Sequence, residues 1–246
     1  MSETERRAAI RPGEAIKRGA WAIRDWAYAA RWQLQSLGPT TADDYRSGIR
    51  QPIIVVPGVY ETWHFMRPLM EALHDRGHPI YVVTELGHNL HDVPDSAEVV
   101  MAVVEREGLD KVLLLTHSKG GLIGKYAMAH RDPHRRIERM VAIASPFAGS
   151  SYARFAPVHH LRVFRAADPV LAALAREADA NSRITSVYGE FDTMIPGGSE
   201  LAGATNVKLP THGHFSILGD PRTREAVLRV IEGTDAAARD AEGGLG

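Results

Sequence analysis

The residues best placed to do chemistry surround Ser118. Large apolar residues fill most of the stretch 111–116, and small residues follow the serine at Gly120 and Gly121. This pattern predicts a buried strand, a tight turn and a helix, with the serine at the corner between them. There the helix amides can bind developing negative charge, so the hydroxyl is a candidate nucleophile. The alternative is that Ser118 only caps the helix, which requires no chemistry.

A serine nucleophile needs a base, and the base needs a carboxylate that orients it. Asp192 follows a predicted strand at residues 184–188, and His214 follows another at residues 206–209. The carboxyl ends of parallel strands share one edge of a sheet, where ligands and catalytic groups gather. We therefore predict that Ser118, Asp192 and His214 meet at this edge.

Each partner has a competitor close by in the sequence. Glu190 could replace Asp192 as the acid, but it comes earlier in the predicted turn. His212 could replace His214 as the base. We favour His214 because Gly213 allows a tight loop before it and apolar residues follow it.

The elements that must position these residues alternate along the chain from residue 52. Such alternation is typical of a mostly parallel sheet with helices on both faces, the α/β class. Ser96 is the expected N-cap of the second of these helices. The predicted strands are 52–56, 79–84, 111–116, 137–144, 184–188 and 206–209, and the predicted helices are 65–76, 96–107 and 221–231.

The chain is expected to form one main domain at residues 52–232. An insertion at about 150–183 interrupts the alternation, and we predict that it lies over the sheet as a short cap. Asp168 and Pro169 are typical of a helix start within it. Residues 1–51 are expected to form a helical arm packed on the domain, and residues 233–246 a flexible tail.

The arm contains three of the four Trp, within a helix predicted at residues 14–37. Because Trp is usually well buried in folded chains, packing of this helix on the domain is favoured. Because basic residues accompany the aromatic ones, transient contact with a membrane or lipid through this helix is the alternative. The charged N-terminus lacks the apolar run of a secretory signal, so a cytoplasmic location is expected. The oligomeric state has no signature in the sequence.

Composition narrows the function further. With 29 basic and 30 acidic residues the formal charge is −1, so no overall field attracts nucleic acid. Because the chain has no Cys, thiolate catalysis and Cys-ligated metals are excluded. One cluster of potential ligands lacks a recognised motif, so we predict no metal and no cofactor; it comprises His88, His91, Asp92 and Asp95.

Together these motifs resemble the α/β-hydrolase superfamily, in particular its small bacterial lipases and esterases. The resemblance covers about residues 52–232 and rests on the elbow around Ser118, on residues 53–59 and 143–150, and on the run 192–214. Two positions depart from the family pattern: Thr116 replaces the first Gly of the elbow, and Pro57 stands where the family often has His.

The resemblance implies hydrolysis of a small carboxylic ester through an acyl-enzyme on Ser118. It also implies an oxyanion hole made by the amides of Val59 and Lys119, with Asp192 and His214 as acid and base. Two other functions remain open, namely acyl transfer to another alcohol on the same triad, and binding without catalysis, because a fold does not fix a function.

Overall fold

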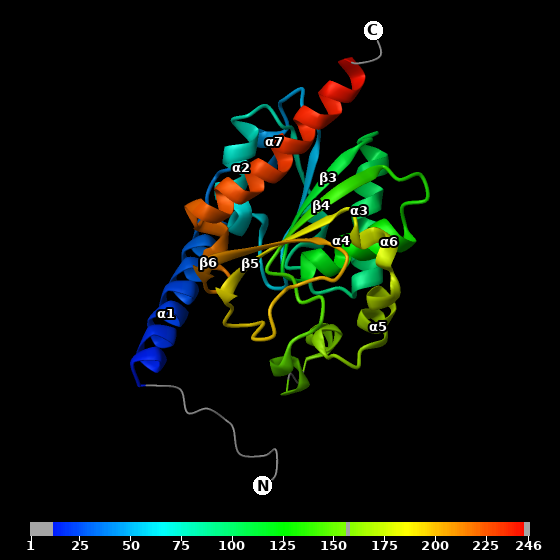
Figure 1. The fold of residues 1–246 in the computed structure, drawn as a ribbon. Coiled ribbons are helices and arrows are strands. Elements are labelled where there is room, and N and C mark those ends of the chain that lie inside the picture. The colour runs from blue at the N-terminus through cyan, green and yellow to red at the C-terminus, as the bar shows by residue number, and fades with distance from the viewer. Residues whose placement is uncertain (1–11, 156–157, 244–246) are drawn as a thin grey trace.

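A single six-stranded sheet forms the centre of the molecule (Figure 1). The computed structural model describes residues 12–155 and 158–243. All neighbouring strands pair in parallel, in the order β2-β1-β3-β4-β5-β6, which confirms the predicted fold class. The strands are β1 (Ile53–Val56), β2 (Ile80–Val82), β3 (Val112–His117), β4 (Ile137–Ile143), β5 (Ile184–Phe191) and β6 (Thr205–His212).

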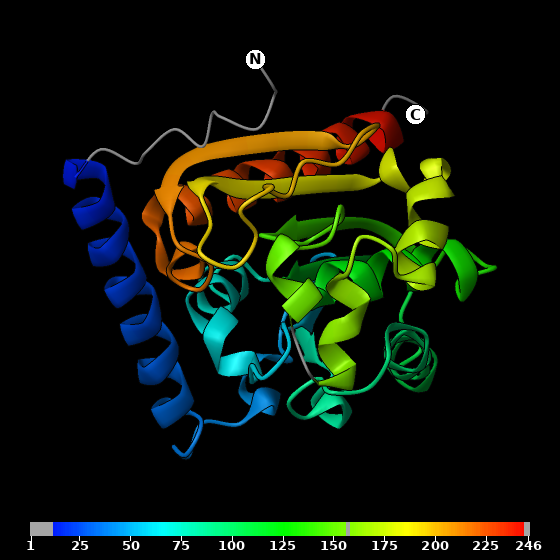
Figure 2. The same cartoon turned by 90° about the horizontal axis from the view of Figure 1, so that it is seen from below.

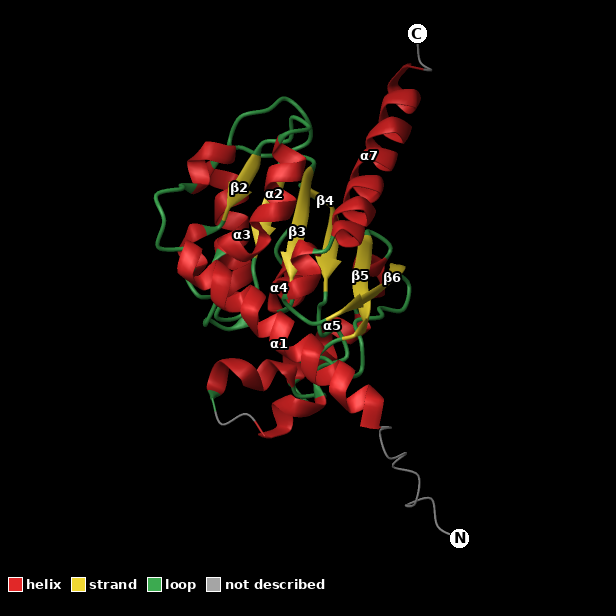
Figure 3. Cartoon of the chain, turned by 90° about the vertical axis from the view of Figure 1, so that its left-hand side faces the viewer, coloured by secondary structure: helices red, strands yellow, loops and turns green. Residues whose placement is uncertain are grey.

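Helices cover both faces of this sheet, which twists from β2 to β6 (Figure 3). Successive residues of a strand point to opposite faces, so Ile54 and Leu114 pack in one core and Ile53 and Leu113 in the other. This double burial explains the continuous apolar runs of the central strands. The first core is shared with α3 (Val93–Arg106) and α4 (Lys119–His130), and the second with α2 (Arg67–His74) and α7 (Pro221–Gly243).

Short helices connect β4 to β5; the first of them lie over the carboxyl ends of the strands, and the last returns to the amino end of β5 (Figure 2). They are η4 (Ser151–Phe155), η5 (His159–Phe164), α5 (Pro169–Arg176) and α6 (Ala178–Asn181). Asp168 is the N-cap of α5, and its carboxylate accepts hydrogen bonds from the amides of Val170 and Leu171 at 2.9 and 3.4 Å. The helix start expected at Asp168 and Pro169 is therefore confirmed.

Helix α1 (Pro12–Gln35) packs across the loops at the same edge of the sheet (Figure 2). Trp21 stacks on the ring of His212 with centroids 3.8 Å apart, and the Tyr28 hydroxyl donates to the carbonyl of Phe65 at 2.9 Å. Trp32 is buried. One face of α1 is thus part of the core. Within the described ranges, no helix combines the length and the apolar character that crossing a membrane requires.

Several element boundaries differ from the expectation by two or more residues. Helix α3 begins at Val93 with Asp92 as N-cap, because Pro94 suits the first turn; the prediction of Ser96 as N-cap was wrong, since that residue is buried inside the helix. Strand β5 continues to Phe191, because it pairs with β6 along its length. Helix α7 continues to Gly243 instead of ending near residue 231, since Ala, Arg and Glu are strong helix formers, so the expected tail is helical to that residue.

Candidate active site

Ser118 occupies a sharp turn between β3 and α4. Its backbone has φ 50° and ψ −121°, a conformation that costs a non-glycine residue energy and is found where function demands it. Its side chain makes no capping hydrogen bond to the helix. Instead, Oγ lies 3.0 Å from Nε2 of His214. The helix-cap alternative for Ser118 therefore does not describe this residue.

His214 and Asp192 complete a hydrogen-bonded row with the serine. Nδ1 of His214 lies 2.9 Å from Oδ2 of Asp192, and the other carboxylate oxygen accepts from the amides of Met194 and Ile195 at 2.7 and 2.8 Å. Ser118, His214 and Asp192 are exposed by only 6%, 4% and 8%. The structure thus brings together the three side chains that were predicted from the sequence to meet.

The two competitors lie apart from this row. Glu190 lies on β5 and approaches His212, with Oε2 3.8 Å from Nε2. Both side chains are partly exposed, and His212 stacks on Trp21 of α1. This second acid–base pair therefore belongs to the packing of α1 on the sheet.

Charges and hydrogen bonds in and around this row shift the pKa values of His214 and Asp192. Burial alone would lower the pKa of His214, but the charge and hydrogen bond of Asp192, with the charges of Glu61 and Asp25, raise it above its usual value. Burial opposes ionisation of Asp192, yet His214 and two backbone amides hold the pKa of this carboxyl below its usual range. The imidazolium that forms when His214 takes a proton is therefore stabilised.

This direction predicts the acid limb of the pH profile. A general base must be neutral, so kcat/KM of a reaction that uses His214 as its base should fall, as the pH decreases, through an apparent pKa above 6.5, the ordinary value of histidine. Asp192→Asn removes the charge that raises this pKa and should move the limb to lower pH. A wild-type limb at or below 6.5 would contradict the prediction.

The loop after β1 also lies close to Ser118. Val59 lies on it, and the amide of Gly58 donates to Oε2 of Glu61 at 2.9 Å. A Cβ at position 58 would lie 2.4 Å from Oε1 of Glu61 and 2.9 Å from Cβ of Ser118, so only glycine permits this approach. Lys119 is the first residue of α4, where an amide has no acceptor within the helix.

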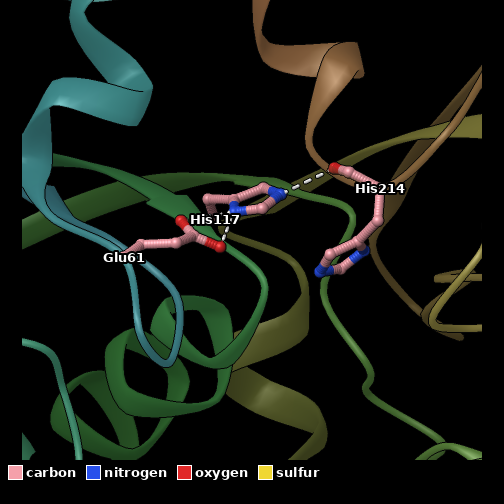
Figure 4. Close-up of side chains that lie close together, drawn as sticks. All are labelled: Glu61, His117 and His214. Atoms are coloured by element: carbon pink, nitrogen blue, oxygen red, sulfur yellow. Dashed lines mark hydrogen bonds and ion pairs between the residues drawn. The ribbon is translucent and has the colours of Figure 1, made fainter. Parts of the chain in front are cut away.

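A buried cluster that the sequence analysis missed links these parts (Figure 4). Nδ1 of His117 lies 2.8 Å from both carboxylate oxygens of Glu61, and Nε2 lies 3.0 Å from the carbonyl oxygen of His214. Ligand atoms of these three residues lie within 4.8 Å of one another, but they already bond to each other, to the backbone and to Ser118 and Asp192. The only signal in the sequence was the position of His117 directly before the serine.

Lys119 also anchors the loop that follows β2. Its buried Nζ donates to the carbonyl of Asn89 at 2.9 Å and to that of His91, and burial lowers the pKa of this amine to about 8. His88 and Leu90 of the same loop line a cavity at the serine. Of the cluster considered for a metal from the sequence, His88 lines this cavity, whereas Asp92 and Asp95 belong to the start of α3.

This cavity measures about 820 Å³ and opens above Ser118 and His214. Most of its wall is apolar and comes from the short helices between β4 and β5, from α1 and from the loops after the strands. Residues from these segments include Tyr152, Leu161, Phe164, Trp26, Ala30, Val59, Met194 and Phe215.

Gly120 makes the turn after the serine sterically possible. A Cβ on this residue would lie 2.2 Å from the carbonyl oxygen of Val56 and 3.0 Å from that of Pro57, both of which are backbone atoms. We expect Gly120→Ala to lower the free energy of unfolding in urea by about 3 kcal/mol, because the backbone must shift.

Gly197→Ala is the matched control for this substitution. No atom lies within 4 Å of a Cβ built there, and the residue is exposed. Its unfolding free energy should stay within about 0.5 kcal/mol of the unsubstituted protein. Equal stabilities for the two variants would contradict the steric argument.

Two curated relatives match part of the chain, whereas no family model matches it. A triacylglycerol lipase of Burkholderia plantarii is 28% identical over 159 residues, which are 59% of this chain and 44% of that protein. A protein of Mycoplasma pneumoniae assigned to the esterases and lipases is 28% identical over 102 residues, 39% of this chain and 36% of that protein. The chain spans less than half the length of either relative.

Solved structures match far more of the chain. A lipase of Bacillus licheniformis has a TM-score of 0.59 and 16% identity, and the match covers 78% of this chain and 95% of that one. A monoacylglycerol lipase of Paleococcus ferrophilus has a TM-score of 0.54 and 17% identity, covering 76% and 94%. At these identities the likeness concerns the fold. The chain therefore has the fold of the α/β-hydrolase superfamily and resembles the bacterial lipases and esterases within it.

Proposed function

We propose that the chain is a serine hydrolase that cleaves carboxylic esters. The observation that carries this proposal is the row Ser118–His214–Asp192, with hydrogen-bond distances of 3.0 and 2.9 Å, whose serine faces an apolar cavity. A hydroxyl hydrogen-bonded to an imidazole that is oriented by a carboxylate is an activated nucleophile. The similarity to lipases and esterases supports the same activity.

In the proposed reaction His214 takes the proton of Ser118 as Oγ attacks the ester carbonyl carbon. The carbonyl oxygen becomes an oxyanion, which the amides of Val59 and Lys119 stabilise. The carbon–oxygen bond to the alcohol then breaks, and His214 gives its proton to the leaving alkoxide. Water attacks the acyl-enzyme in the same way and releases the acid.

The cavity indicates the acyl part of the substrate. Its apolar wall suits a hydrocarbon chain, and the cap contributes to it through Ala153 and Phe164. The cap is small, so we propose that esters with short and medium acyl chains are cleaved ahead of long-chain triglycerides.

Two measurements on the purified protein test the activity. Nitrophenyl esters of graded acyl length should be hydrolysed, and a fluorophosphonate should label the protein at Ser118. Added alcohol that diverts most of the acyl group into a new ester would identify an acyltransferase instead. If the protein neither hydrolysed these esters nor reacted with the fluorophosphonate, the remaining function would be binding without catalysis.

We also propose transient contact between α1 and an anionic lipid surface. Ile16, Ile23 and Leu34 share the outer side of the helix and are exposed by 74%, 74% and 70%. Basic residues at a spacing of seven form a neighbouring stripe. These are Lys17, Arg24 and Arg31.

The double substitution Ile23→Asp and Leu34→Asp should abolish sedimentation with phosphatidylglycerol vesicles, because it places charge on the apolar stripe. Ile49→Asp is the control, since Ile49 is fully exposed in the loop before β1. Phosphatidylcholine vesicles should bind the unsubstituted protein less. Equal sedimentation of all three proteins would contradict the proposed contact.

A further inference from the structure

Asp25 is a buried carboxylate on α1 that faces the loop of the proposed base. It is exposed by 1%, and it shares its helix face with the aromatic residues Trp21, Tyr28 and Trp32. Its partners lie 168 to 191 residues later in the sequence. Oδ1 accepts hydrogen bonds from the amides of Phe215 and Ser216 at 2.7 and 2.8 Å.

The second oxygen of Asp25 joins the loop of the acid to that of the base. Oδ2 accepts from the amide of His214 at 2.9 Å and from the hydroxyl of Thr193 at 2.6 Å. Thr193 directly follows Asp192. One carboxylate of α1 is therefore bonded to the proposed base and to the residue next to the proposed acid.

These bonds constrain the loop for physical reasons. Three successive N–H groups at residues 214–216 converge on one point, which is a backbone site for an anion. The amides of residues 214 and 216 are buried and that of residue 215 is partly buried, so loss of the carboxylate would leave at least two of them without an acceptor. An ionised carboxylate offers only acceptors and can satisfy the amides and the hydroxyl together.

The backbone directly before His214 passes close to the carboxylate of Asp25. Gly213 has φ 108°, in the region that favours glycine, and a Cβ there would lie 2.6 Å from Oδ1 of Asp25. Nearby, Arg24 donates to the carbonyl of His212 at 2.6 Å. Helix α1 therefore holds the whole turn from which the imidazole of His214 extends.

We propose that Asp25 is a positioning residue that holds His214 in line with Ser118 and Asp192, a role that rests on the proposed function of these three residues. Asp25 touches no reacting atom and acts through the backbone of the loop. Residues of α1 next to it, among them Trp26 and Ala30, also line the cavity. The active site is thus completed by a helix that precedes the sheet in the sequence.

Asp25→Asn tests this role with little change in volume. One oxygen becomes an NH₂ group, which faces donors and cannot accept from them. We expect kcat to fall about 100-fold with KM nearly unchanged, because the imidazole moves while most of the cavity wall stays. The low-field NMR proton resonance of the His214–Asp192 hydrogen bond should shift or disappear. Asp110→Asn, the same substitution at an exposed carboxylate, should change neither quantity.

A milder variant keeps the test decisive if Asp25→Asn does not fold. Thr193→Val removes one donor to Oδ2 while keeping the shape of the side chain, and it should lower kcat roughly 10-fold and shift the same resonance. The proposed role of Asp25 is wrong if folded Asp25→Asn has the same kcat as the unsubstituted protein and its resonance does not shift. If only Thr193→Val folds, the same two results in that variant overturn the role. The proposed function is wrong if the wild type neither hydrolyses esters nor reacts with a fluorophosphonate. In that case the NMR resonance of the His214–Asp192 hydrogen bond still tests whether Asp25 positions His214.

Discussion

Ser118→Ala is expected to lower kcat for a nitrophenyl ester by roughly 10⁴- to 10⁶-fold. The substitution removes the oxygen that would form the acyl-enzyme, and no nearby group can replace it in line with Nε2 of His214 at 3.0 Å. Labelling by a fluorophosphonate should vanish with the activity. The melting temperature should change little, because the hydroxyl makes no capping bond to α4 and an alanine fits the same space.

Ser145→Ala is the matched control for the loss of a buried hydroxyl. Ser145 packs against α4, close to where a Cβ of Gly121 would be, and its hydroxyl makes only a long bond of 3.4 Å to the carbonyl of Ile143. This variant should keep its turnover and its labelling. An active, labelled Ser118→Ala protein would show that another residue is the nucleophile.

The strands of the sheet could be predicted because burial on both faces leaves a direct mark on the sequence. The run Leu113–Leu115 is apolar at every position, since alternate residues enter the two cores. The direction of the strands then placed Asp192 and His214 at one edge. Helix boundaries were harder to predict, because Asp92 and Ser96 are both typical N-caps and only the position of Pro94 within the first turn separates them.

The supporting carboxylates could not be predicted because their partners are distant in sequence. Glu61 lies in the loop after β1 and His117 ends β3, so they meet only when these two strands pair. In the sequence, Asp25 is one acidic residue within the helix predicted at residues 14–37. One signal was present: an acid three residues before Tyr28 and seven before Trp32 lies on the face that becomes buried. A charge at such a position requires buried partners.

The geometry separates His214 from its neighbour His212. His214 is buried between Ser118 and Asp192, and both ring nitrogens are bonded to them. His212 lies at the end of β6 with its ring stacked on Trp21, and burial lowers its pKa, although Glu190 opposes the shift. Only His214 has a carboxylate that orients the ring and a hydroxyl within reach of the other nitrogen.

His214→Ala should therefore lower kcat by roughly 10³-fold or more, since among the described residues no other base is in contact with Ser118. His212→Ala should cost less than about 10-fold, because it removes a stacking contact with Trp21 while the backbone carbonyl that accepts from Arg24 remains. Both variants should be compared with the same ester at saturating concentration, with circular dichroism to show that each is folded. If His212→Ala were the more damaging substitution, the base would be the histidine that packs against α1, and the row through His214 would have to be abandoned.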